Sequence, residues 1–341
     1  MMTRPLREWA ADDPALRDPT AFREKVAMGG EPVLIRGYAQ SWPLLQAAQI
    51  SDRTVCDYLR RHDSGKRPQV MLGDPAIEGR YFYRDGLDGL NFERIEMSID
   101  DALDRMLAHA EDPALPSAYL GSLVTPAYLP GLVDAHPCAL APPGVAMRLW
   151  IGNASHVACH YDAYENFACV LAGRRRFTLY PPDAIGDLYV GPIDFTLAGQ
   201  PVSMAAADRD HPQRYPRFAR AEARKLVVEL EPGDALYLPK LWWHQVEALS
   251  PFNIMANFWW DAFAIGPDAP MLAMLLAMIT LGERPEADRK AFRAYFDHFV
   301  FRPDGHPLAH LPPEKRGVLR DLAGGGYGQI RAMIMRTLRG Q

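Results

Sequence analysis

Residues 160–182 read HYDAYENFACVLAGRRRFTLYPP, and this stretch decides the fold. It contains two short β-type segments, FACVLAG (167–173) and RRFTLYPP (175–182), which are separated by a glycine and closed by two prolines. Short apolar or alternating runs between such turn residues are typical of strands. The stretch therefore predicts a pair of strands joined by a tight turn.

Similar segments lie on both sides of this pair. They are MRLWIG (147–152), KLVVELEPGD (225–234), ALYLP (235–239) and NIMANFWW (253–260). Several short strands without intervening helices favour a sandwich or barrel over a βαβ sheet. We expect an N-terminal mixed α/β region over 1–117, a barrel over 118–266 and a helical region over 267–341.

Apolar residues at helical spacing predict the flanking helices. In the first region they mark 55–61 and 99–110, while Asp18-Pro19-Thr20 is a helix start that predicts a helix to about Met28, and 32–36 is a short β-rich run. After residue 267 they mark four helices, at 271–282, 287–299, 313–323 and 328–338. The whole chain is therefore expected to be α+β, with a β-barrel between helical ends.

Composition favours an ordinary soluble protein. The net charge is -5, which argues against a nucleic-acid partner, although Arg174, Arg175 and Arg176 could form a local basic patch. The N-terminus lacks the apolar core of a signal peptide, and the longest apolar run, 271–281, is too short to span a bilayer. The four cysteines show no metal-binding spacing. We expect a cytoplasmic protein with free thiols and no membrane association.

The tripeptide His160-Tyr161-Asp162 is a candidate metal motif. With ten histidines and 42 acidic residues, about one His-x-Asp/Glu match is expected by chance, and a second one exists at His109 and Glu111. In a strand, residues i and i+2 face the same side and can share one ion, whereas in a helix they diverge. His109 lies in a helical pattern, so we expect a surface histidine there.

His244, in LPKLWWHQVEAL, is the candidate third ligand. Two imidazoles and one carboxylate form the facial triad of non-haem iron(II) oxygenases, which leaves coordination positions open. Spacing alone leaves the alternative that His160 and His244 are ordinary, partly buried histidines.

Several motifs in order resemble the cupin-like Jumonji-C hydroxylases, with the closest likeness to the asparaginyl hydroxylases among them. They are EPVLIRGYAQSWP (31–43), the opening stretch at 160–182, EPGDALYLPKLWWHQVEAL (231–249) and NFWW (257–260). The likeness covers about residues 20–262. It implies a double-stranded β-helix, the jelly-roll barrel of cupins, and it implies iron(II) held by His160, Asp162 and His244.

The resemblance also implies a pocket for the co-substrate 2-oxoglutarate. Its matching positions are Tyr119, Asn166, Arg175 and Asn257. Arg175 stands where the family usually has the lysine that pairs with the distal carboxylate, and its planar fork suits a carboxylate. Arg174 or Arg176 could take that role instead, although strand alternation places both opposite Arg175.

One further departure from the family pattern is Val157, which replaces a threonine hydroxyl near the co-substrate. The missing hydrogen bond could come from Ser155 or Tyr180.

The expected reaction consumes dioxygen and 2-oxoglutarate, hydroxylates a peptide or protein side chain, and releases succinate and carbon dioxide. A small-molecule hydroxylase or a demethylase of the same family is an alternative. A ligand-binding cupin without turnover, or a metal-dependent isomerase or lyase on the same barrel, is a rival of another class. The apolar helices after residue 267 predict a homodimer.

Overall fold

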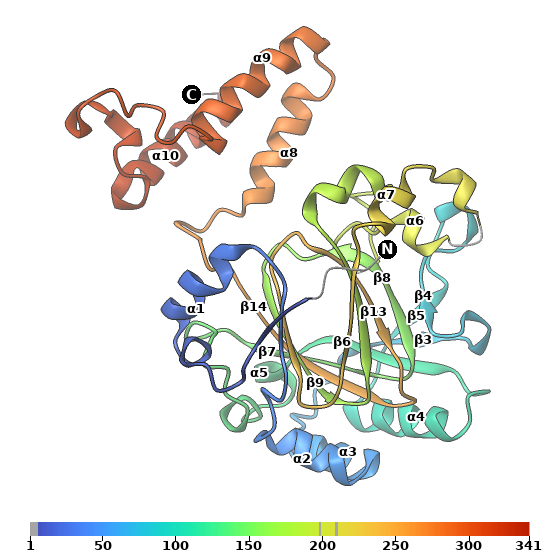
Figure 1. The fold of residues 1–341 in the computed structure, drawn as a ribbon. Coiled ribbons are helices and arrows are strands. Elements are labelled where there is room, and N and C mark those ends of the chain that lie inside the picture. Colours follow the sequence, from blue (N-terminus) through green and yellow to red (C-terminus); the bar gives the residue numbers. More distant parts are fainter. Residues whose placement is uncertain (1–5, 198, 209–210, 341) are drawn as a thin grey trace. The chain divides into compact units, whose positions relative to one another are not determined.

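Two facing β-sheets form the framework of the chain (Figure 1). In the computed structural model, which describes residues 6–197, 199–208 and 211–340, the larger sheet has the strand order β1-β2-β12-β9-β14-β7-β6-β3-β5. The smaller sheet has the order β11-β10-β13-β8-β4. The strands are β1 (Arg7–Trp9), β2 (Val33–Ile35), β3 (Gln69–Gly73), β4 (Arg80–Tyr81), β5 (Phe92–Glu96), β6 (Ser117–Val124), β7 (Met147–Gly152), β8 (Ser155–Tyr161), β9 (Glu165–Ala172), β10 (Arg175–Tyr180), β11 (Leu226–Leu230), β12 (Ala235–Leu238), β13 (Trp243–Ala248) and β14 (Asn253–Trp260).

From β7 to β14 the chain passes repeatedly from one sheet to the other. The strand pairs of this part are antiparallel throughout. This is the winding of a double-stranded β-helix, so the predicted jelly-roll barrel is confirmed. The predicted strands at 147–152 and 253–260 match β7 and β14 residue for residue.

Apolar side chains from both sheets fill the space between them. Phe177 and Leu179 of β10 meet Val170 of β9 and Leu236 of β12 in one buried cluster. Each such side chain is almost fully buried, and burial of a Leu or Phe stabilises a fold by roughly 1.5–3 kcal/mol. The barrel is therefore a packed core along most of its length.

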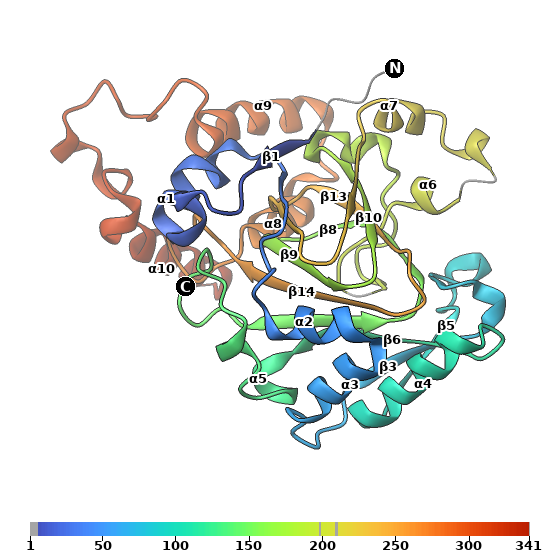
Figure 2. The same cartoon turned by 60° about the horizontal axis from the view of Figure 1, so that its bottom comes forward.

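Helices cover the outer face of the larger sheet (Figure 2). They are α1 (Pro19–Lys25), α2 (Pro43–Ile50), α3 (Asp52–Arg60) and α4 (Ile99–Glu111). The first turn of α4 shows why it begins where it does, because the Ser98 hydroxyl accepts a hydrogen bond from the Asp101 backbone N–H at 3.0 Å. Three shorter helices, α5 (Thr125–Tyr128), α6 (Met204–Ala207) and α7 (Phe218–Glu222), lie in connections between strands.

The chain divides into two compact units, with the boundary between Ala262 and Phe263. The second unit contains α8 (Pro270–Leu281), α9 (Glu286–Phe296) and α10 (Tyr327–Leu338). The helix predicted at 313–323 is wrong, because this stretch contains only short 3-10 and irregular turns. Gly317 lies there at a φ of 55°, in the left-handed region that interrupts a helix.

Among the described residues, no helix is long and apolar enough to cross a membrane.

Candidate metal centre and adjoining cavities

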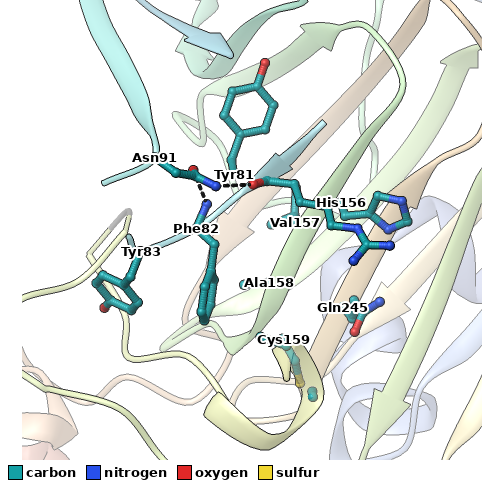
Figure 3. Close-up of a pocket in the computed structure, with 12 residues that line it drawn as sticks. Tyr81, Phe82, Tyr83, Asn91, His156, Val157, Ala158, Cys159 and Gln245 are labelled. Atoms are coloured by element: carbon teal, nitrogen blue, oxygen red, sulfur yellow. Dashed lines mark hydrogen bonds between the residues drawn. The ribbon is translucent and has the colours of Figure 1, made fainter. Parts of the chain in front are cut away.

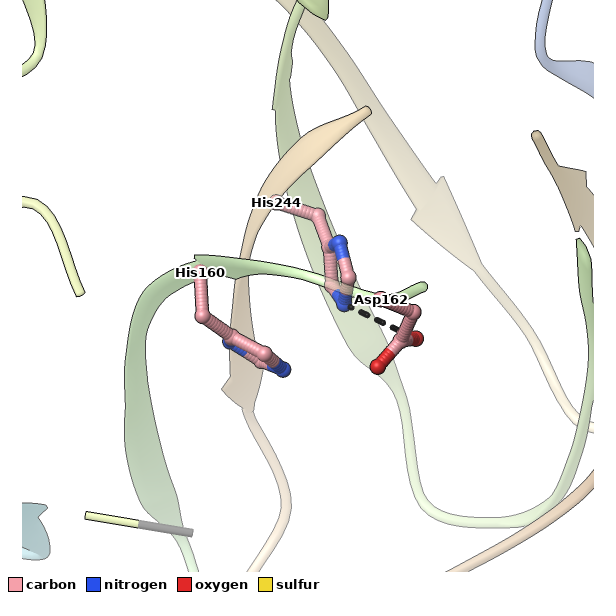
Figure 4. A group of neighbouring side chains, drawn as sticks. All are labelled: His160, Asp162 and His244. Atoms are coloured by element: carbon pink, nitrogen blue, oxygen red, sulfur yellow. Dashed lines mark ion pairs between the residues drawn. The ribbon is translucent and has the colours of Figure 1, made fainter. Parts of the chain in front are cut away.

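The two histidines of the candidate triad lie directly opposite each other on paired strands. His160 of β8 is the register partner of His244 of β13, and their ring centroids are 4.3 Å apart. Asp162 follows β8 immediately, and its Oδ2 lies 3.7 Å from Nε2 of His244. One ligand atom from each residue lies within 4.8 Å of the other two (Figure 4). The structure therefore brings together the three residues expected to bind a metal.

A β-bulge in β8 gives this face its alignment. Val157 pairs with Val246 and His160 pairs with His244, so β8 has one more residue than β13 between these pairs. Val157 and His160 are three positions apart, so in a regular strand they would lie on opposite faces of the sheet, and the bulge brings them to the same face. Both line the same cavity.

Backbone carbonyls fix the tautomer of both histidines. Nδ1 of His160 lies 2.8 Å from the Ala158 carbonyl oxygen, and Nδ1 of His244 lies 3.0 Å from that of Trp242. A carbonyl can only accept, so each Nδ1 carries the proton and each Nε2 offers its lone pair. Burial and the neighbouring His160 lower the pKa of His244 to about 4, while Asp162 acts to raise it. His244 is therefore neutral at physiological pH, the form in which imidazole binds metals.

A chain of side-chain amides holds Asp162. Asn166 of β9 donates to Oδ2 of Asp162 at 2.9 Å, and Asn257 of β14 donates to Oδ1 of Asn166 at 3.3 Å. The indole N–H of Trp150 donates to Oδ1 of Asn257 at 2.8 Å. The two asparagines were expected beside the co-substrate. They do lie at the site, but their side-chain amides are used to orient the carboxylate of Asp162.

Arg175 of β10 is the only one of the three consecutive arginines that points into the barrel. It is 1% exposed, and it hydrogen-bonds to the Tyr119 hydroxyl and to the Trp150 carbonyl oxygen, the latter at 3.3 Å. Its Nε has no hydrogen-bond partner in the described part of the chain, and no carboxylate there pairs with it. Burial lowers the pKa of Arg175, yet a guanidinium stays protonated, so the site contains an uncompensated buried cation.

Arg174 and Arg176 face outward, as the alternation of a strand requires. Arg176 donates to Glu229 at 2.7 Å and lies 3.6 Å from Glu247, and Arg174 lies 3.8 Å from Glu229. The basic patch considered for this run is therefore not formed, because one arginine is buried and the other two lie beside acidic side chains.

Val157 lines the site as expected from the sequence, and the two candidates for a replacement hydroxyl differ. The Tyr180 hydroxyl donates its hydrogen bond to Glu222 at 2.6 Å, so this hydroxyl is directed to Glu222 and not to the co-substrate pocket. The Ser155 hydroxyl is buried and has no hydrogen-bond partner among the described residues. Of the two candidates, only Ser155 keeps an unpartnered hydroxyl among the described residues, but it lines neither of the cavities at the triad.

Two cavities meet at the triad. The inner one, of about 40 Å³, lies between the sheets and is lined by the triad together with Tyr119, Arg175 and the two asparagines. The outer one, of about 100 Å³, shares Tyr119, Trp150, Val157, His160, Asp162 and Trp259 with it. No local sequence signal marked this outer cavity, because its walls come from segments far apart in the chain.

A third cavity, of about 240 Å³, lies along β8 and shares Tyr81, Val157 and Ala158 with the outer cavity (Figure 3). Its walls include Phe82, His156 and Gln245, and the last two alternate along their strands with the inward-facing Val157 and His244. Its lining contains neither a triad residue nor Arg175.

Comparisons with known proteins show that the chain is similar to cupin-like and Jumonji-C proteins. A family model described as a cupin-like domain matches residues 19–265. The chain is 28% identical over 263 residues to Jumonji C domain-containing protein 5 of Drosophila melanogaster, covering 73% of this chain and 59% of that protein. It is 28% identical over 274 residues to the human bifunctional peptidase and (3S)-lysyl hydroxylase JMJD7, covering 71% and 81% respectively. It is 30% identical over 120 residues to the lysine-specific demethylase JMJ31 of Arabidopsis thaliana, covering 34% and 21%.

Proposed function

The chain belongs to the cupin-like domain family, and from this premise we propose that it is an iron(II)- and 2-oxoglutarate-dependent oxygenase. The observation that carries the proposal is the buried guanidinium of Arg175 in the cavity that also contains the triad. A buried cation without a carboxylate is costly, and an anionic ligand would remove that cost. A dicarboxylate with one end at the metal and the other at Arg175 meets this requirement.

The described residues fit both groups. His160, Asp162 and His244 would hold the iron, and two imidazoles with one carboxylate suit iron(II) while leaving coordination positions open. Arg175 and Tyr119 would take the distal carboxylate of 2-oxoglutarate by charge-assisted hydrogen bonds. The inner cavity has about 40 Å³, so lining side chains must shift to admit a five-carbon diacid.

In the overall reaction, one molecule of dioxygen oxidises both the substrate and 2-oxoglutarate. One oxygen atom enters a substrate C–H bond and gives an alcohol, and the other enters succinate as C1 of 2-oxoglutarate leaves as carbon dioxide. Bound iron(II) supplies the activation of dioxygen. The chain fixes the tautomers of His160 and His244, orients Asp162 through Asn166, and keeps water out of the apolar side of the site.

We favour hydroxylation of a peptide or protein side chain as the finer function. A relative that matches most of this chain is named a lysyl hydroxylase. The segment between β10 and β11 also contributes Leu197 and Val202 to the outer cavity beside the metal, as a wall of a substrate groove would. Demethylation, for which another relative is named, and a small-molecule substrate are the alternatives.

The test compares Arg175→Gln with Arg174→Gln, which removes a neighbouring cation on the outer face. Under anaerobic conditions, iron(II) and 2-oxoglutarate binding is measured by equilibrium dialysis, and succinate release is measured in air. We expect the Arg175 variant to retain iron and to bind 2-oxoglutarate at least about tenfold more weakly, a loss of about 1.4 kcal/mol. The Arg174 variant should behave as wild type. Unchanged 2-oxoglutarate affinity in Arg175→Gln, or no 2-oxoglutarate binding by the wild type, would refute the proposal.

A further inference from the structure

The outer cavity beside the metal has almost entirely apolar walls. Met71 of β3 and Phe92 of β5 form one side, Leu197 and Val202 form another, and aromatic rings complete the lining. Hydrogen bonds hold the segment that contributes Leu197 and Val202 at two points, one on each side of the cavity wall. Val202 forms a β-bridge with His160, and the Tyr83 hydroxyl donates to the Phe195 carbonyl oxygen at 2.5 Å. The cavity wall is therefore attached to the strand that bears the first metal ligand.

Three arginines contact residues of the cavity lining without lining the cavity themselves. The guanidinium of Arg148 stacks on the ring of Trp259 at 4.9 Å, and that of Arg94 lies 5.5 Å from the ring of Phe92. Arg175 lies behind Tyr119, to which it is hydrogen-bonded. Among the described lining residues, Asp162 is the only acid, and its oxygens face the metal position. A cationic group in the cavity would meet like charges and find no free carboxylate, which makes its burial costly.

The aromatic lining is not arranged as a cage for a methylated ammonium group. Such a cage needs open ring faces around the cation. Here the rings of Tyr81 and Phe92 pack edge to face with centroids 5.3 Å apart, and Tyr81 and Tyr119 lie 5.8 Å apart. Arginines already occupy positions over the rings of Phe92 and Trp259. The rings pack on one another and leave only a small apolar space.

The size of that space limits what can enter. An apolar cavity of roughly 150 Å³ accommodates benzene in another protein, so the volume of about 100 Å³ found here corresponds to about four carbon atoms. Among the lining residues that the structure describes, Gln200 has the one amide side chain. An aliphatic group fits both the volume and the chemistry of the walls.

We propose that the group presented to the metal is an uncharged aliphatic side chain of about four carbons, rather than a lysine, a methylated lysine or an arginine. This rests on the proposed oxygenase function and names the substrate class for that site. It separates this chain from the relatives named for lysine, whose substrate carries a cation.

The experiment uses the full chain loaded with zinc(II) and 2-oxoglutarate, which cannot turn over. Binding of three N-acetyl, N-methylamide amino acids is followed by tryptophan fluorescence, since Trp150 and Trp259 line the cavity. The probes carry norleucine, lysine or glutamate side chains, which are neutral, cationic and anionic. We expect norleucine to bind at least about tenfold more tightly than either charged probe, because no arginine among the described residues lines the cavity and a charge of either sign would be buried against apolar walls.

Two matched variants assign the binding to the cavity. Leu197→Asn places an amide in the wall and should weaken norleucine binding about tenfold, while Ile193→Asn, an exposed position of the same segment, should not. Tighter binding of lysine or glutamate, no binding of norleucine, or equal effects of the two variants would overturn the inference. Binding of 2-oxoglutarate is measured by dialysis on the same samples. If the wild type fails to bind 2-oxoglutarate, the proposed oxygenase function fails, whereas an unexpected order of the three probes contradicts only the proposed substrate class.

Discussion

The side-chain amide of Asn166 donates to Oδ2 of Asp162 at 2.9 Å, across the turn between β8 and β9. Asn166 in turn accepts from Asn257 of β14, so the metal carboxylate is tied to the opposite sheet. Groups that hydrogen-bond to a metal ligand fix its orientation, and their loss typically weakens metal binding by roughly 10- to 100-fold. Asn166 is therefore a positioning residue for the metal.

Replacement of Asn166 by alanine should lower metal affinity by roughly tenfold or more, because Asp162 loses the bond that directs it. Asn257→Ala should have the same direction and a smaller effect, since it acts through Asn166. Competition with a fluorescent chelator measures both affinities. Asn91→Ala is the control, because Asn91 hydrogen-bonds the backbone of Arg80 and Phe82 away from the metal. Wild-type metal affinity in Asn166→Ala would show that the amide has no positioning role.

Alanine at His160, Asp162 or His244 should remove most of the bound metal and all turnover while leaving the fold intact. His109→Ala is the matched control, since His109 stands in the other His-x-Glu motif, is half-buried on α4 and lies outside the triad. Metal content is measured by mass spectrometry and folding by circular dichroism. The purified protein can carry zinc, nickel or manganese, because such ligands discriminate poorly by affinity. Equal metal content in the His109 and His244 variants would contradict the assignment.

The spacing of His160 and Asp162 is a local signal, but the prediction of all three metal ligands, His244 included, rested on the resemblance to the family. His160 and Asp162 are two residues apart, and strand alternation directs both to one side. The bulge in β8 could not be predicted, and β8 itself is not among the strands expected from the sequence. Strand β13, which carries His244, was not predicted as a strand. All its residues are buried, including the polar Gln245 and Glu247, so it shows no alternating pattern.

The hydrogen bonds of Asn166 and Asn257 depend on the register between β9 and β14, which a single sequence does not reveal. The same holds for the outer cavity, because Met71, Phe92 and Leu197 are brought together only by the fold. The direction of Arg175 was predictable from alternation, but its burial without an acidic partner was not.

Stability should fall at alkaline pH, and Cys56 of α3 should contribute to this fall. Burial raises the pKa of the Cys56 thiol to about 12, whereas an unfolded thiol titrates near about 8.5. The neutral thiol therefore stabilises the fold fully below pH of about 8.5, and this contribution is lost as pH rises toward 12. Urea unfolding at increasing pH should show wild type losing up to about 1.4 kcal/mol more per pH unit than Cys56→Ala. Identical slopes would show that Cys56 does not titrate differently on folding.

The second unit carries apolar side chains that its own helices do not cover. On α8, Leu272, Leu275 and Ile279 are 55%, 45% and 82% exposed. On α10, Met333 and Leu338 are 52% and 64% exposed. Leu272, Leu275 and Ile279 recur at helical spacing and so share one face of α8, and an exposed apolar face of this kind marks an interaction site. We propose that a second copy of this chain covers it, as expected from the sequence.

The double variant Leu275→Glu with Ile279→Glu should convert a dimer to a monomer, because two charges per chain cannot be buried in an apolar interface without partners. Light scattering measures the mass in solution, which should fall by half. Lys290→Glu is the control, since it changes an exposed charge on α9, where Lys290 pairs with Glu286 at 2.6 Å, and leaves α8 intact. Circular dichroism confirms that each variant keeps its helices. A monomeric wild type, or a dimer that survives the double substitution, would show that another surface covers these side chains or that they stay in contact with solvent.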